Sequence, residues 1–218
     1  MKRIFGLIVC LVSSLFGFSQ NPPFWNDIQK FKAEDSANAP QKKAIVFTGS
    51  SSFTLWKDVQ QRFPDHKVIN RGFGGSSLPD VIRYADDVIF KYKPKQVVIY
   101  CGENDAASDS AISGDTIANR FITLFNMIRT KLPKASIAYV SMKPSPSRVK
   151  FRTAVVEGNR LIKAFVESKK NAAYIDVYSK MLDPNGNPIG SLFLQDSLHM
   201  NSTGYDIWQK EIGPYLKK

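Results

Sequence analysis

The sequence predicts an α/β protein, a three-layer α/β/α doubly wound domain built on a five-stranded parallel sheet. Two observations support this fold class. Short apolar runs alternate along the chain with segments whose apolar residues recur at helical spacing. The apolar runs are also nearly continuous, which is typical of strands that helices cover on both faces. Right-handed crossovers between such strands produce a doubly wound sheet.

The apolar runs predict strands at residues 44–47, 66–70, 96–101, 136–142 and 172–178. Apolar residues at helical spacing predict helices over residues 53–63, 78–92, 117–132, 155–166 and 202–216. Residues 21–43 are polar, but Phe24, Trp25, Ile28 and Phe31 are spaced to pack one helical face on the body. In open parallel sheets ligands bind at the carboxyl ends of the strands, so we expect the functional site in the turns that follow them.

The first residues differ from the rest of the chain. Lys2 and Arg3 precede an apolar run at residues 4–12 and then small and polar residues, which predicts a signal peptide at 1–19. The run is too short to span a bilayer, so we expect a secreted or periplasmic protein without stable membrane insertion. Cys10 follows Ile8 and Val9 instead of small residues, which disfavours a lipid anchor. Residues 20–42 would then be an N-terminal extension and residues 43–218 the single domain.

The charge of the chain bears on its expected partners, and its cysteine content bears on disulfides. The 218 residues carry a net charge of +11, which could favour acidic polysaccharide, anionic lipid or nucleic acid. The basic residues are scattered and form no recognised nucleic-acid module, so we expect a solvated basic surface and no nucleic-acid partner. Without the signal peptide Cys101 is the only cysteine, so no internal disulfide is expected. Cys101 ends an apolar run and should be a small buried side chain.

The first strand leads into the turn Gly49-Ser50-Ser51-Ser52, which precedes a helical pattern. A serine here would lie at the open edge of the sheet, where the start of a helix presents free backbone N–H groups. Two other interpretations apply to this turn alone. Ser51 or Ser52 could simply cap the helix, or the turn could hold a phosphate. The P-loop spacing with its lysine is missing, however.

A serine hydroxyl becomes an effective nucleophile only when a base removes its proton, and that base is most often a histidine oriented by a carboxylate. The chain has two histidines, and His66 begins a strand at the end opposite the expected site. His199 follows the last strand within Asp196-Ser197-Leu198-His199. Asp196 could accept the Nδ1–H of His199 and leave Nε2 facing Ser51. Alternatively, Asp196 and His199 only cap backbone groups in a loop.

Three donors could stabilise an oxyanion: the backbone N–H of Ser51, the backbone N–H of Gly75 and the side-chain amide of Asn104. Gly75 lacks a side chain, so its backbone can approach a substrate closely. Asn104 could instead be an ordinary turn residue. Asp105 is expected to fix its loop rather than to transfer protons.

Four short segments together resemble the sequence blocks of the SGNH hydrolases, also called GDSL-type esterases and lipases. They are Gly49-Ser50-Ser51, Gly75 after Asn70-Arg71-Gly72, Gly102-Glu103-Asn104-Asp105, and Asp196-Ser197-Leu198-His199. Their order and their placement at strand ends match the family over residues 49–199. The resemblance implies a flavodoxin-like sheet of order 2-1-3-4-5. It also implies Ser51 as nucleophile, Asp196 and His199 as the other triad members, and Ser51, Gly75 and Asn104 as oxyanion donors.

One position departs from the family. The usual Gly-Asp-Ser reads Gly-Ser-Ser here, with Ser50 in place of an acid that is not the triad carboxylate. The triad chemistry should therefore be kept, whereas the resemblance does not fix the loop geometry or the pH dependence. Register with the family favours Ser51 over its neighbouring serines as nucleophile.

We therefore expect an exported serine esterase that acts on a small-molecule or glycan ester and needs no cofactor or metal. Export disfavours an intracellular thioester and the absence of a long apolar lid disfavours a long-chain lipase, which favours acetyl groups on carbohydrate. Trp56 and Phe73 are near enough to the site to contact a sugar, although core positions suit them better. The alternatives are a lysophospholipase-type lipid esterase and a noncatalytic carbohydrate-binding module on the same fold. A metal-dependent hydrolase is disfavoured because only Asp196 and His199 offer ligands at a suitable spacing.

Overall fold

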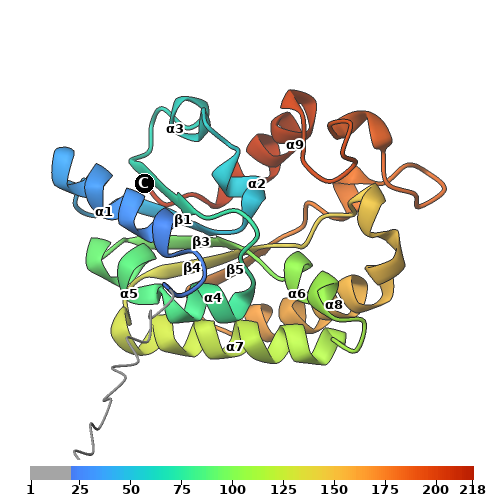
Figure 1. Ribbon diagram of the computed structural model, residues 1–218, viewed down its shortest axis with the longest axis horizontal. Helices are drawn as coiled ribbons and strands as arrows, with labels where there is room; N and C mark the ends of the chain where they lie inside the picture. Colours follow the sequence, from blue (N-terminus) through green and yellow to red (C-terminus); the bar gives the residue numbers. More distant parts are fainter. Residues whose placement is uncertain (1–20) are drawn as a thin grey trace, which may run out of the picture.

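The computed structural model describes residues 21–218, and the expected signal peptide at 1–19 lies outside them. The described residues form a parallel five-stranded sheet of order β2-β1-β3-β4-β5, which confirms the predicted sheet (Figure 1). Its strands are β1 (Ile45–Gly49), β2 (Val68–Gly72), β3 (Gln96–Tyr100), β4 (Ser136–Val140) and β5 (Ala172–Ile175). Gly49 is in register with both Gly72 and Tyr100, so β1, β2 and β3 end at the same edge.

Helices cover both faces of the sheet and complete the three layers (Figure 1). One face carries α1 (Trp25–Ala37), α4 (Leu78–Arg83), α5 (Ala85–Val88), α7 (Gly114–Lys131) and α8 (Arg152–Glu167). The other face carries α2 (Ser51–Thr54), α3 (Val59–Arg62) and α9 (Ser202–Ile212). The short helix α6 (Glu103–Ser108) follows β3 at the edge where the site was expected. The 3-10 helices are η1 (Phe90–Tyr92), η2 (Pro146–Phe151), η3 (Ser179–Met181), η4 (Gly190–Leu192) and η5 (Gly213–Tyr215).

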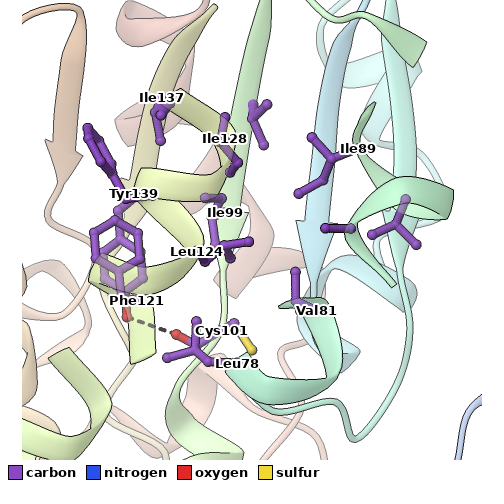
Figure 2. Packing of buried hydrophobic residues seen from close by; sticks show 14 of the residues in the cluster. Leu78, Val81, Ile89, Ile99, Cys101, Phe121, Leu124, Ile128, Ile137 and Tyr139 are labelled. Carbon is purple, nitrogen blue, oxygen red and sulfur yellow. Dashed lines mark hydrogen bonds between the residues drawn. The ribbon is translucent and has the colours of Figure 1, made fainter. Parts of the chain in front are cut away.

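Each central strand contributes side chains to two cores. In β3, Val97 and Ile99 face the core under α4 and α7, whereas Val98 and Tyr100 face the core under α2 and α9. This burial on both faces explains why the strands are apolar throughout instead of alternating with polar residues. Figure 2 shows part of the first core: Leu78 and Val81 from α4 and Phe121, Leu124 and Ile128 from α7 pack against Ile99, Ile137, Tyr139 and Cys101.

Aromatic side chains cluster in the second core and pack α2 and the residues just after it against α9. Trp56 stacks on Tyr205 with ring centroids 5.1 Å apart, and Trp208 contacts Tyr100 at 4.7 Å. The hydroxyl of Tyr205 also donates a hydrogen bond to the backbone oxygen of Ser52 (2.8 Å). The segment that carries Ser51 is therefore tied to the helix that follows His199.

Trp56 and Phe73 are completely buried, so both are core residues and neither is placed to contact a sugar. The packing of α1 agrees with its sequence pattern, because Ile28 and Phe31 are buried in the first core. Within residues 21–218, every helix is too short or too polar to cross a membrane.

Two predicted helices are broken in the structure. The helix expected over residues 53–63 is divided into α2 and α3, although Phe53, Trp56, Val59 and Phe63 are all buried as their spacing requires. The side-chain amide of Asn70 donates to the backbone oxygens of Phe53 (2.6 Å) and Trp56 (3.4 Å), which compensates the carbonyl groups that a continuous helix would have used.

The helix expected over residues 78–92 is divided into α4, α5 and η1, because the backbone leaves the helical region at Tyr84 and Ile89. Buried Ala85, Val88 and Ile89 still face the core, so the apolar spacing identified the buried residues but not the breaks. The last helix ends at Ile212 and continues only as η5, which contains Pro214.

Gly49 ends β1 in a backbone conformation that side chains rarely adopt, with φ of +131°. A Cβ atom at this position would lie 1.9 Å from the backbone oxygen of Tyr100 on the neighbouring strand. The two strands are held by hydrogen bonds on both sides of this point, so the backbone cannot move apart without breaking the sheet.

We predict that Gly49→Ala lowers the free energy of unfolding by about 3 kcal/mol or more, because it combines backbone strain with a clash against backbone atoms. The matched control is Gly190→Ala, where a new Cβ has no atom within 4 Å. Urea unfolding followed by tryptophan fluorescence compares the two variants. Equal stabilities of the two variants would contradict this account of the turn.

Candidate active site

The turn between β1 and α2 presents Ser51 at the sheet edge. The backbone N–H of Ser50 donates to Tyr100 (3.0 Å), and the carbonyl of Gly49 accepts from the backbone N–H of Phe73 (2.9 Å). The carbonyl of Gly49 also accepts from the hydroxyl of Ser76 (3.1 Å). The strand ends on both sides therefore fix the position of Ser51, which is the first residue of α2 and is half-buried.

The structure brings Ser51, His199 and Asp196 together. Nε2 of His199 lies 3.0 Å from Oγ of Ser51, and Nδ1 of His199 lies 2.6 Å from Oδ2 of Asp196. An ionised carboxylate only accepts hydrogen bonds, so Asp196 fixes the proton of a neutral His199 on Nδ1. Nε2 is then free to accept the proton of the Ser51 hydroxyl.

A short loop holds Asp196 and His199 in this arrangement. Ser197 has the left-handed φ of +55°, which turns the chain so that Oδ1 of Asp196 accepts the backbone N–H groups of Leu198 and His199 (both 2.9 Å). The backbone oxygen of His199 accepts from Leu194 (2.7 Å). Asp196 therefore both caps the loop and orients the histidine. Its Oδ1 accepts the backbone N–H groups, and its Oδ2 contacts the ring of His199.

These hydrogen bonds lower the pKa of Asp196 from 3.8 to about 2. The largest contributions come from the backbone N–H groups of His199 and Leu198, followed by the His199 ring. Asp196 is thus an anion at any pH at which an ordinary esterase operates.

The three candidate oxyanion donors lie around the same turn. The backbone N–H groups of Ser51 and Gly75 donate no hydrogen bond to any residue between 21 and 218. Gly75 is exposed and has a φ of +85°, which favours glycine. Asn104 is the second residue of α6, and its Nδ2 donates to Oγ of Ser50 (2.6 Å) and to the backbone oxygen of Ser76 (3.0 Å).

Each of the three serines in the turn has a distinct environment. Ser51 contacts His199, Ser50 is buried and accepts from Asn104, and the hydroxyl of buried Ser52 has no partner among the described residues. Ser50 therefore supplies a neutral hydroxyl acceptor for the amide of Asn104.

The sequence prediction missed a buried ion pair beneath the site. Nζ of Lys143, which follows β4, lies 2.6 Å from Oε2 of Glu103, and the hydroxyl of Tyr100 donates to the same oxygen. Burial alone would raise the pKa of Glu103, but the charge and hydrogen bond of Lys143 lower it below its ordinary value. The pair anchors the residue next to Asn104; a lysine directly after an apolar strand was the available signal.

Asp105 fixes its loop, as expected. One carboxylate oxygen accepts from the backbone N–H of Leu78 (2.9 Å) and the other from Arg120 (2.8 Å), which joins α6 to α4 and α7. Asp105 is completely buried, and burial raises its pKa in spite of these bonds.

The 3-10 helix η2 also borders the site, which was not expected. The backbone N–H of Ser147 donates to the carbonyl of Ser197 in the His199 loop (3.0 Å). Nη2 of Arg148 lies 3.5 Å from Oδ1 of Asn104. The segment therefore links the Asn104 side of the site to the His199 side.

The second histidine and possible metal ligands also bear on the chemistry of residues 21–218. His66 lies away from the site, with Nδ1 3.2 Å from the backbone oxygen of Lys217. Among residues 21–218, no three His, Cys, Asp or Glu side chains are close enough together to hold a metal ion.

We predict that Asp196 remains ionised in the folded protein at about pH 3, because its depressed pKa extends ionisation below the ordinary range. The stability that ionised Asp196 contributes is present above its unfolded pKa and is lost as the pH falls from 3.8 toward 2. Carbon-13 NMR of the aspartate carboxyls, with Asp196→Asn to assign the signal, measures this directly. A titration midpoint at or above 3.8 would contradict the hydrogen-bonding scheme.

Comparison with known proteins identifies relatives of the whole domain. A curated relative, the N-acylneuraminate cytidylyltransferase of Escherichia coli O18:K1:H7, is 26% identical over 175 residues, which cover 79% of this chain. The chain spans only 40% of that relative's length.

Three solved structures share the fold at low sequence identity. A Streptococcus pneumonia protein, provisionally described as a platelet activating factor, has a TM-score of 0.75 and 17% identity and covers 88% of this chain and 92% of its own. A GDSL-like lipase from Bacteroides thetaiotaomicron has a TM-score of 0.71 and 22% identity, with coverages of 86% and 96%. A catalytic mutant of an acetylxylan esterase from Geobacillus stearothermophilus has a TM-score of 0.60 and 16% identity, with coverages of 78% and 92%.

The sequence pattern of the GDSL-like Lipase/Acylhydrolase family matches residues 41–207, which is most of the chain and includes every residue of the site described above. The chain therefore belongs to the GDSL-like Lipase/Acylhydrolase family.

Proposed function

We propose that the protein is an exported serine esterase that removes short acyl groups, in particular acetyl groups on carbohydrate, through an acyl-enzyme. The observation that carries the proposal is the chain of contacts from Ser51 Oγ to His199 Nε2 (3.0 Å) and from His199 Nδ1 to Asp196 (2.6 Å). These distances allow proton transfer without rearrangement of the side chains.

In the first half-reaction Oγ of Ser51 bonds to the ester carbonyl carbon, and its proton passes to Nε2 of His199. The bond to the alcohol then breaks as His199 returns the proton to the leaving oxygen. In the second half-reaction water gives a proton to His199 and attacks the acyl group, and Oγ of Ser51 leaves with that proton as the carboxylic acid forms. Asp196 stays ionised throughout and stabilises the imidazolium form of His199.

The negative charge on the carbonyl oxygen would be stabilised by the backbone N–H groups of Ser51 and Gly75 and by the amide of Asn104. The two backbone groups have no competing acceptor between residues 21 and 218. The amide of Asn104 would exchange the hydroxyl of Ser50 for the oxyanion as its acceptor. A neutral serine releases this hydrogen bond more readily than the carboxylate usual in the family, because charged acceptors bind about twice as strongly.

Two further observations support the substrate and location. An acetylxylan esterase and a family 3 carbohydrate esterase of Clostridium thermocellum are among the proteins that share this fold. Residues 1–19 begin with positive charges, continue with an apolar run and end with small and polar residues, and this order supports export.

We predict that Ser51→Ala and His199→Ala each lower kcat for 4-nitrophenyl acetate by roughly 10³-fold or more, because each removes a member of one catalytic unit. His66→Ala serves as the matched histidine control and should keep wild-type kinetics. Circular dichroism verifies that all variants are folded. Wild-type rates in either site variant would exclude the assigned triad, and carbohydrate binding without ester turnover in the wild type would indicate the binding-module alternative.

We also predict that Asn104→Ala lowers kcat by roughly 10²-fold to 10³-fold with a smaller change in KM, since an oxyanion donor acts mainly in the transition state. Asn119→Ala, which changes an exposed residue of α7, is the control. A change confined to KM would place Asn104 in ground-state binding instead.

The substrate class is tested by comparing acetylated xylo-oligosaccharides with 4-nitrophenyl esters of increasing chain length and with lysophosphatidylcholine. We expect the highest kcat/KM for the acetylated sugars and a decline with chain length. Preference for the longer esters or for the lysolipid would favour the lipid-esterase alternative.

A further inference from the structure

A small hollow lies beside the site, between η2 and the loops that follow β4 and β5. Apolar parts of Val155, Tyr178 and Pro188 line it, and Arg148 and Arg152 border it. The lining includes no aspartate or glutamate. The hollow therefore combines an apolar wall with guanidinium groups.

The positive charge at this hollow is not balanced by nearby acids. Lys143, which also lines it, is neutralised by buried Glu103. In contrast, neither Arg148 nor Arg152 forms an ion pair within 4.0 Å with any carboxylate of residues 21–218. The guanidinium of Arg152 lies near Gly186. The acid of that loop, Asp183, uses Oδ1 to accept the backbone N–H groups of Asn185 and Asn187.

Arg148 connects the hollow to the reacting groups. Its Nη2 lies 3.5 Å from Oδ1 of Asn104, and Nδ2 of the same amide donates to Ser50 beside the nucleophile. One amide side chain thus separates a half-buried, unpaired guanidinium from the turn that presents Ser51. A group a few bonds from the scissile carbonyl can reach this guanidinium.

We propose that the hollow is a substrate subsite in which Arg148 and Arg152 bind an anionic group, a carboxylate or a phosphate, carried by the ester. This inference rests on the proposed esterase function and names the charge of its substrate. Guanidinium groups bind carboxylate and phosphate oxygens in a bidentate manner, and the partly buried position of Arg148 strengthens such a bond. The net charge of +11 favours the approach of the same substrates.

A different role for Arg148 alone is to orient the amide of Asn104. That role predicts equal effects on neutral and anionic esters, since both need the same oxyanion donor. Arg152 separates the two roles, because it lines the hollow without a hydrogen bond to Asn104.

The test measures kcat/KM for two sets of esters. In the first, neutral phenyl acetate is compared with 4-acetoxybenzoate and 4-acetoxyphenyl phosphate, which carry the anion on the alcohol half. In the second, neutral 4-nitrophenyl butyrate is compared with mono(4-nitrophenyl) succinate, which carries the anion on the acyl half. The readout is the ratio of anionic to neutral kcat/KM, relative to the wild type. We expect Arg148→Gln and Arg152→Gln each to lower this ratio by about tenfold for at least one anionic ester, because each removes a charged hydrogen bond. Lys150→Gln, which removes a charge from the same segment outside the hollow, should leave the ratio unchanged.

Comparison of the benzoate ester with the phosphate ester identifies which anion is bound. Comparison of the two sets identifies the half of the ester that carries it. Unchanged ratios in both arginine variants, or an equal fall in Lys150→Gln, would overturn the subsite. Turnover of phenyl acetate by the wild type tests the esterase proposal separately. Absent turnover would overturn both proposals, whereas turnover with unchanged ratios in the arginine variants would overturn the subsite alone.

Discussion

The alignment of three strand ends is the constraint on which the site depends. Gly49 is in register with Gly72 on one side and Tyr100 on the other, so the turns after β1, β2 and β3 begin at one level. Those turns carry Ser51, Gly75 and Asn104. A side chain at Gly49 would meet the carbonyl of Tyr100, and one at Gly72 would meet the backbone of α2 at 2.8 Å. The close approach of main chains therefore sets where the candidate nucleophile and the oxyanion donors lie.

The second half of the site comes from the far end of the chain and is held by different means. Aromatic contacts of Phe53 in α2 and of Trp56 just after it with Tyr205 and Trp208 hold α9 against this segment, which places the loop before α9 next to Ser51. Within that loop the carboxylate of Asp196 organises both the backbone turn and the His199 ring. Hydrophobic packing between these elements is strong but has no preferred direction. The hydrogen bonds of the Asp196 carboxylate therefore set the direction in which Nε2 of His199 points.

Apolar runs predicted the strands and the parallel sheet because burial on both faces leaves strands that are apolar throughout. The strand order was implied by the resemblance to the SGNH hydrolases, and the structure confirms it. The same patterns brought Ser51, Asp196 and His199 to attention, since few residue types can perform acyl transfer and the chain has only two histidines. The break between α2 and α3 escaped prediction because two carbonyl groups at the break, those of Phe53 and Trp56, accept from Asn70, a residue distant in sequence. The Glu103 and Lys143 pair and the position of Arg148 escaped it for the same reason: each partner is defined only by the folded chain.

The most direct test of the central claim, that Ser51 is an activated nucleophile, is reaction of the folded protein with a fluorophosphonate followed by peptide mass mapping. The account predicts one adduct, on Ser51, that forms in the wild type and is lost in His199→Ala. An adduct on Ser50 or Ser52 would contradict the assigned register of the turn. The absence of any adduct in a protein shown to be folded would contradict the activation of Ser51 by His199.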